Sequence, residues 1–274
     1  MTSHLSELAQ AAATVARLGG AVLKRFFGQI TIAHANTKRP FDFVSEADHT
    51  AEQTMTSFIK DHFPEDTIYA EEGSRQEAGS GNRWIIDPLD GTTNFLHGYP
   101  MFSVSVAVES GGQVIAGAVL DPLRDELFVA ERGRGAYLNG VRLKVSSIND
   151  PARSLLATGF PFRSKDLLQP YLRTFAFLFE RVSGIRRAGS AALDLAYVAC
   201  GRCEGFWELG LSPWDIAAGE LLIQEAGGRV TDFDGSPSAV WRGNVIASNG
   251  LIHDLILEAV ALVFGTTSQT PSNQ

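Results

Sequence analysis

The chain begins with apolar residues at the spacing of an α-helix. Between residues 5 and 28 they recur every three or four positions, which places them on one face of an α-helix. Residues 45–62 repeat the pattern, with Ser45 placed to cap the N-terminus of the helix and Pro64 just beyond its end. We therefore expect two amphipathic helices before any strand.

The pattern then changes to the short apolar runs that are typical of β-strands. Pro88 has no N–H to donate to a ladder, so we expect it to end one of these strands at Asp87. Gly111-Gly112 and Asn139-Gly140 supply tight turns, which predicts a mainly antiparallel sheet. The expected strands are residues 67–71, 84–87, 102–109, 114–120, 126–131 and 136–143.

Strands and helices alternate in the second half of the chain, whereas the first half has two helices followed by a mainly antiparallel sheet. The expected fold class of the whole chain is α+β. The strands are predicted at residues 155–158, 205–208, 229–232 and 244–247, and the helices at 165–182, 190–201, 215–226 and 250–264.

The order of predicted helices and strands changes near residue 146. This divides the chain into an N-terminal half, residues 1–146, and a C-terminal half, residues 147–264. No flexible linker marks this boundary, so we expect the halves to pack as one compact unit. Residues 265–274 are polar and lack apolar periodicity. They are predicted to be a disordered tail.

Composition narrows the functional classes. The 274 residues are 45% apolar and 20% charged, which is typical of a globular protein, and the formal net charge is −8. Such a charge argues against a broad binding surface for nucleic acid or anionic membrane. No apolar run approaches the roughly 18 residues that span a bilayer, and the N-terminus has no signal-peptide pattern. We expect a cytoplasmic protein without direct nucleic-acid or membrane binding.

Several apolar runs end in carboxylates. Asp90 follows Asp87 after a turn, so both side chains and the carbonyl of Leu89 can converge on one point. Two carboxylates about 4 Å apart repel by about 4 kcal/mol at an effective dielectric of about 20, and a shared cation removes that cost. Hard oxygen ligands suit magnesium, manganese or calcium better than zinc. Glu71 and Glu208 end two other apolar runs, and Asp215 opens a helix soon after the second of them.

The segment that follows Asp90 favours phosphate. Gly91-Thr92-Thr93-Asn94 reads as a turn into a short helix, where free N–H groups and the helix dipole attract anions. Phosphate-monoester hydrolysis is very slow without a catalyst, and metal ions supply charge neutralisation and an activated water. The pattern thus indicates a metal-dependent phosphomonoesterase. The competing interpretation is structural, because Asp-Pro and Asp-Gly are common turn dipeptides and acids at strand ends are often merely solvated.

Other candidate chemistry is weaker. Cys200 and Cys203 have the spacing of a redox pair, but no second pair completes a zinc site, so we interpret both as small buried thiols. The six histidines lack ligand spacing and are interpreted as surface or capping residues. A phosphatase with an aspartate nucleophile uses an Asp-x-Asp pattern, whereas Asp87 and Asp90 lie one residue farther apart.

Two long segments resemble signatures of the inositol monophosphatase family of lithium-sensitive, magnesium-dependent phosphatases. They are WIIDPLDGTTNF at 84–95 and WDIAAGELLIQEAGG at 214–228. Shorter segments at 42–48, 70–73, 157–162 and 189–196 extend the resemblance over nearly the whole chain apart from the tail. The last two of these segments, together with residues 212–215, are most similar to the bacterial inositol-1-monophosphatase, SuhB-like branch. The resemblance implies a layered αβαβα sandwich, hydrolysis of inositol 1-phosphate to inositol and phosphate, and a homodimer.

The resemblance also implies site residues and two or three Mg²⁺ ions. One ion would be held by Glu71, Asp87 and the Leu89 carbonyl, and a second by Asp87, Asp90 and Asp215. Asp48 would lie near a third, weaker ion. Glu71 and Thr92, together with Asp87, form the implied catalytic set, in which Glu71 and Thr92 orient the attacking water.

For the substrate, the resemblance assigns the N–H groups of Gly91 and Thr92 to phosphate. The contacts to the alcohol would come from Asp90, Gly189, Ser190, Ala191 and Glu208. Adjacent inositol hydroxyls suit Glu208, because a carboxylate can accept two hydrogen bonds from them. Lys38 lies four residues before Asp42, one closer than in some relatives, so its match to the family's lysine near the third metal stays open.

Several alternatives stay open. Histidinol-phosphate, sugar bisphosphate and nucleotide bisphosphate phosphatases share the same metal signature, and fold does not choose among them. A regulatory protein associated with the transcription machinery, with this fold as a scaffold, is a hypothesis of another class. All five implied metal positions carry competent ligands here, which favours an enzyme.

Overall fold

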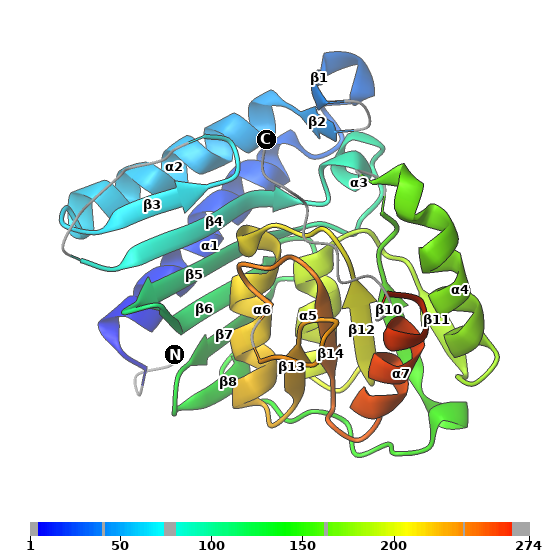
Figure 1. The fold of residues 1–274 in the computed structure, drawn as a ribbon. Helices are drawn as coiled ribbons and strands as arrows, with labels where there is room; N and C mark the ends of the chain where they lie inside the picture. Colours follow the sequence, from blue (N-terminus) through cyan, green and yellow to red (C-terminus); the bar gives the residue numbers. More distant parts are fainter. Residues whose placement is uncertain (1–4, 40–41, 74–80, 162–163, 238, 265–274) are drawn as a thin grey trace, which may run out of the picture.

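Five layers of helix and sheet make up the fold in the computed structural model, which describes residues 5–39, 42–73, 81–161, 164–237 and 239–264. Helices α1 and α2 cover one face of a seven-stranded sheet, α5 and α6 lie between this sheet and a five-stranded sheet, and α4 and α7 cover the far side (Figure 1). The predicted αβαβα sandwich is confirmed. The predicted disordered tail, 265–274, lies outside the described residues.

The helices largely follow the expected ranges. In α1 the buried Gly19 permits close packing on α2, because a Cβ there would lie 2.6 Å from Met55 Sδ. The helices are α1 (Glu7–Phe26), α2 (Glu46–His62), α3 (Thr92–Leu96), α4 (Leu168–Phe179), α5 (Ala191–Ala199), α6 (Pro213–Glu225) and α7 (His253–Phe264).

The first sheet has the order β3-β4-β5-β6-β7-β8-β9 and is mainly antiparallel as predicted, with β3 parallel to β4. Asn139 and Gly140 have φ values of 48° and 83°, and their turn divides the expected strand 136–143 in two. The strands are β3 (Thr67–Ala70), β4 (Arg83–Asp90), β5 (Ser103–Ser110), β6 (Gln113–Asp121), β7 (Glu126–Glu131), β8 (Gly135–Leu138) and β9 (Val141–Arg142).

Strand β4 does not end at Asp87, so that prediction is wrong. Asp87 pairs with Ser105 and Asp90 pairs with Ser103, with an irregularity in the register between them. The ladder shifts around Pro88, which has no N–H, and resumes at Asp90. Both acids are thus fixed by the sheet instead of one being left to a loop.

The second sheet has the order β11-β10-β12-β14-β13. Strand β10 is parallel to both of its neighbours, and the remaining pairs are antiparallel. Strands β1, β2 and β11 were not predicted, because they are short and have little apolar alternation. The bounds are β1 (Asn36–Arg39), β2 (Asp42–Val44), β10 (Leu155–Thr158), β11 (Gly184–Arg186), β12 (Gly205–Glu208), β13 (Arg229–Thr231) and β14 (Val245–Ser248).

Three apolar clusters hold these layers together. One joins α1 and α2 to the first sheet, one lies around α5 and α6, and one joins the second sheet to α4 and α7. Small residues bring the middle layer close to the first sheet: a Cβ on Gly117 of β6 would lie 3.1 Å from Ala218 Cα of α6. The middle layer therefore brings the helix starts near Ser190 and Asp215 toward Asp90 at the end of β4.

His253 corrects the interpretation of all histidines as surface or capping residues. It is fully buried, and its ring nitrogens lie 2.9 Å from Thr231 Oγ1 and 2.9 Å from Ser248 Oγ. Burial lowers the pKa of this imidazole to about 4. His34, His49, His62 and His97 are exposed as predicted, and His4 lies outside the described residues.

We expect His253 to make the protein less stable in acid. An unfolded histidine has a pKa of about 6.5, so between pH 6.5 and 4 the unfolded chain takes up a proton that the folded chain does not. The free energy of unfolding should fall over this window, by at most about 3 kcal/mol from this residue. Urea unfolding at pH 7 and pH 4.5 should show a smaller fall for His253→Gln than for the unaltered protein. An equal fall would contradict this role.

Candidate metal and phosphate site

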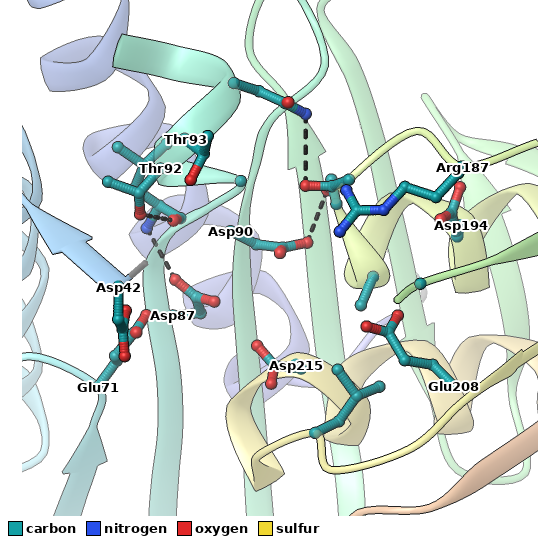
Figure 2. A pocket seen from close by; sticks show the side chains of 18 of the residues that line it. Asp42, Glu71, Asp87, Asp90, Thr92, Thr93, Arg187, Asp194, Glu208 and Asp215 are labelled. Atoms are coloured by element: carbon teal, nitrogen blue, oxygen red, sulfur yellow. Dashed lines mark hydrogen bonds between the residues drawn. The ribbon is translucent and has the colours of Figure 1, made fainter. Parts of the chain in front are cut away.

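One pocket of about 350 Å³ lies where β4 ends and α3, α5 and α6 begin (Figure 2). Segments from both halves of the chain line it, because β4 and α3 belong to the first and α5 and α6 to the second. Residues implied by the sequence that line it are Glu71, Asp87, Leu89, Asp90, Gly91, Thr92, Gly189, Ser190, Ala191, Glu208 and Asp215.

Three buried aspartates converge at the centre of this pocket. One carboxylate oxygen from each of Asp87, Asp90 and Asp215 lies within 4.8 Å of the other two. Burial and the charges of Glu71, Asp90 and Asp215 raise the pKa of Asp87 well above its usual range. These groups repel one another, and an oxygen-ligated divalent cation is what would offset that repulsion. The donor set therefore fits a hard metal ion such as Mg²⁺.

Backbone N–H groups and hydroxyls orient these carboxylates. The N–H of Leu89 donates to Asp87 Oδ1 (2.9 Å), and the N–H of Ser212 donates to Asp215 Oδ2 (2.7 Å) at the N-terminus of α6. Each bond joins residues two or three positions apart, so each acid is held by the backbone of its own segment. The side chains are held before any ligand arrives, which preorganises the site.

Asp90 connects the two halves of the molecule. Its Oδ2 accepts hydrogen bonds from the Ser190 hydroxyl (2.6 Å) and the Ala192 N–H (2.8 Å), both at the start of α5. The Ser103 hydroxyl lies 3.4 Å from the same oxygen. All three bonds reach one oxygen of the carboxylate. Ser190, implied as a substrate contact through its backbone, is thus also an anchor for Asp90.

Glu71 lines the same pocket but does not belong to the close group of three aspartates. Its carboxylate lies 3.2 Å from Lys38 Nζ, which also contacts Glu72. Burial raises the pKa of Glu72 to about 8, while the contact with Lys38 acts in the opposite direction. Lys38, whose role stayed open in the sequence, therefore lies directly beside one of the implied metal ligands.

Asp48 lies behind Thr92 and does not line the pocket. The Thr92 hydroxyl is 3.2 Å from Asp48 Oδ1 and 3.1 Å from the Leu89 carbonyl oxygen. Asp48 is also the capping-box partner of Ser45 at the start of α2. Its buried carboxylate thus holds Thr92 in place.

The far side of the pocket carries a mixed set of charges. Figure 2 shows Arg187, Asp194 and Glu208 on the side opposite Asp42 and Glu71. The Glu208 carboxylate packs against the backbone of Gly159, where a Cβ would lie only 2.0 Å from Glu208 Oε1.

Comparisons with known proteins show the family of this chain. A model of the inositol monophosphatase family matches residues 4–263. The chain belongs to the inositol monophosphatase family. It is 48% identical to the protein called Nus factor SuhB of Pseudomonas aeruginosa, covering 85% of this chain and 88% of that one. It is 46% identical to the inositol-1-monophosphatase of Mesorhizobium japonicum, covering 88% and 91% of the two chains.

A solved structure shares the layered fold of this family. The extragenic suppressor protein SuhB of Bartonella henselae superposes with a TM-score of 0.89 at 42% identity, covering 93% of this chain and 98% of that one. The two signatures that suggested the family in the sequence, at 84–95 and 214–228, both contribute acids to the three-aspartate group. Within the described residues, no helix is both long and apolar enough to cross a membrane.

Several residues of this family member's pocket were not predicted. Asn94 holds its rim, because its amide donates to the carbonyls of Met101 (2.7 Å) and Ala188 (2.9 Å). Asn94 lies in the first signature and Asp194 in the 189–196 segment. Neither was predicted as a site residue, because neither is an acid at the end of an apolar strand. The others include Asp42, Thr93, Thr158, Gly159 and Arg187.

The two cysteines match their interpretation as buried thiols, Cys203 fully and Cys200 in part. Burial raises the pKa of Cys203 to about 12 and that of Cys200 as well. Raised pKa values leave little reactive thiolate.

Proposed function

We propose that this protein is a Mg²⁺-dependent phosphomonoesterase that hydrolyses inositol 1-phosphate to inositol and phosphate. The observation that carries the proposal is the convergence of three buried aspartates beside a glycine turn, in a pocket large enough for a small phosphate ester. Mg²⁺ bound there would neutralise phosphate charge and make water more acidic. The residues proposed to hold two ions are Glu71, Asp87, Leu89 through its carbonyl, Asp90 and Asp215, with Asp48 near a third.

The chain's own groups would align the reactants. We assign the N–H groups of Gly91 and Thr92 to the phosphate oxygens. Glu71 and the Thr92 hydroxyl would orient the attacking water, with Glu71 accepting its proton. Thr92 is suited to this because Asp48 and the Leu89 carbonyl fix its hydroxyl. Water attacks phosphorus directly, so trapping an aspartyl-phosphate would contradict this assignment.

The released alcohol would lie on the far side of the pocket, against Asp90, Glu208 and the segment Gly189 to Ala191. Glu208 would accept hydrogen bonds from two adjacent inositol hydroxyls. The Glu208 carboxylate can occupy its position only because Gly159 has no Cβ.

Gly159→Ala should therefore displace the Glu208 carboxylate and lower kcat/KM for inositol 1-phosphate by about tenfold or more, the effect of losing one charge-assisted hydrogen bond. Steady-state kinetics of Gly159→Ala and Glu208→Gln, alone and together, check this. The double variant should be little worse than either single one. Additive losses would mean that the two changes act independently.

The substrate assignment is tested by comparing phosphate release from four esters in the presence of Mg²⁺. Inositol 1-phosphate should have the highest kcat/KM. Histidinol phosphate, fructose 1,6-bisphosphate and 3'-phosphoadenosine 5'-phosphate represent the histidinol-phosphate, sugar bisphosphate and nucleotide bisphosphate alternatives. A preference for any of these three would replace inositol 1-phosphate as the substrate.

A second candidate function is a regulatory role in transcription. The observation in its favour is that several relatives at 45–48% identity carry the name Nus factor SuhB. A cell in which Asp87→Asn replaces the normal protein separates the two functions, since a regulatory role should survive the loss of the metal site. The homodimer, the lithium sensitivity and the cytoplasmic location stay predictions.

A further inference from the structure

Asp194 is a buried residue whose carboxylate has no hydrogen-bond partner in the described part of the chain. It is 3% exposed and lines the pocket. Among the residues that the structure describes, no donor forms a hydrogen bond or an ion pair with its side chain. Buried acids in proteins are almost always hydrogen-bonded, because leaving one unpaired is costly.

Other buried acids of this protein follow that rule. Asp66 accepts a hydrogen bond from Trp84 Nε1 (2.8 Å), and Glu204 accepts one from the Leu155 N–H (2.6 Å). Asp121 accepts one from the Leu123 N–H (3.0 Å). Asp194 is thus unlike buried acids that serve the fold.

The surroundings of Asp194 restrict what could partner it. It lies in the first turn of α5, where the helix dipole favours a negative charge. Burial and the charges of Glu208 and Asp90 nevertheless raise its pKa well above the usual range, against the opposing effect of Arg187. Two acids and one arginine on this side of the pocket disfavour a second anionic group on the substrate. They favour a neutral group that donates hydrogen bonds.

We propose that Asp194 is a second specificity-determining carboxylate for the alcohol part of the substrate, accepting a hydrogen bond from a hydroxyl of the leaving group. With Glu208 on the same side of the pocket, it selects phosphate esters of polyols over esters of alcohols that lack further hydroxyls (Figure 2). This inference rests on the proposed phosphomonoesterase function. It adds a contact at the same site that neither the three aspartates nor Glu208 supplies.

The test compares Asp194→Asn with the unaltered protein on two substrates. Inositol 1-phosphate carries hydroxyls on its leaving group, and 4-nitrophenyl phosphate carries none. The ratio of their kcat/KM values should fall by about tenfold in Asp194→Asn, as for loss of one hydrogen bond to a charged group. Asp254→Asn is the matched control, because Asp254 lies in the first turn of α7 and is exposed. It should leave the ratio unchanged.

Thermal unfolding of the metal-free protein separates this role from a structural one. Asn keeps the shape of Asp but removes an unpaired buried charge, so the unfolding midpoint of Asp194→Asn should stay the same or rise. A lower midpoint with equal losses on both substrates would assign Asp194 to the stability of α5 and overturn the inference. An unchanged substrate ratio would overturn it as well, while the proposed function stands. If the unaltered protein hydrolyses neither ester, the proposed function fails first and this inference fails with it.

Discussion

Asp87→Asn should lower Mg²⁺-dependent phosphate release by about a thousandfold or more while leaving the fold intact. Asp87 is the acid that both proposed metal positions share, and an amide supplies no negative charge to either. Metal ions stabilise transition-state charge by several kcal/mol, and about 4 kcal/mol corresponds to a thousandfold in rate. Phosphate release at saturating Mg²⁺ measures the loss. Because the change removes one of three repelling charges, the metal-free protein should not become less stable.

The chain contains its own control for this variant. Asp121-Pro122-Leu123 repeats Asp87-Pro88-Leu89. In both segments the backbone N–H of the leucine donates a hydrogen bond to the aspartate. Both aspartates are 1% exposed. Asp121→Asn should change phosphate release less than twofold, although it loses its ion pair with Arg124. Equal activity of the two variants would remove Asp87 from the centre of the site.

These twin segments show what the sequence could establish and where it stopped. The three identical residues form the same N–H to aspartate hydrogen bond twice, once inside β4 and once where β6 ends, so these residues alone predict no chemistry. The fourth residue differs: Arg124 lies 2.7 Å from Asp121 and neutralises it, whereas Asp90 adds a second negative charge beside Asp87. The composition of the Asp87 segment therefore indicated a cation site. The third acid, Asp215, could be joined to it only through the family resemblance.

Features decided by tertiary packing were beyond local pattern. Local pattern predicted most of the helices and strands, whereas the five layers were implied only by the family resemblance. The continuation of β4 past Pro88 depends on β5, which resumes pairing at Ser103. The burial of His253 and of Asp194 arises where distant elements meet, and neither residue stands in a distinctive pattern. Local sequence therefore specified the elements and the first acids, and packing completed the pocket.

Gly91→Ala should both destabilise the protein and nearly abolish its activity. Gly91 has a φ of +97°, a conformation that strains any residue with a Cβ. An added Cβ would also lie 3.0 Å from the Met101 carbonyl oxygen and 3.1 Å from that of Gly189, on opposite halves of the chain. Strain and crowding together should lower the free energy of unfolding by about 2–3 kcal/mol. Relief of the crowding would move the N–H groups proposed for phosphate, and displacements of about 1 Å can cost roughly a hundredfold in rate.

Gly98→Ala distinguishes backbone strain from crowding. Gly98 lies just beyond the same short helix, α3. Its φ is +68°, yet nothing lies within 4 Å of the position of an added Cβ. The free energy of unfolding of Gly98→Ala should fall by only about 1 kcal/mol, and the variant should keep most of its activity. Urea unfolding and phosphate release, measured on both variants, give the comparison. Equal losses of stability would show that the close approach of the Met101 and Gly189 carbonyls is unimportant. Full activity in Gly91→Ala would separate this turn from phosphate binding, because the turn could then shift without consequence for the reaction.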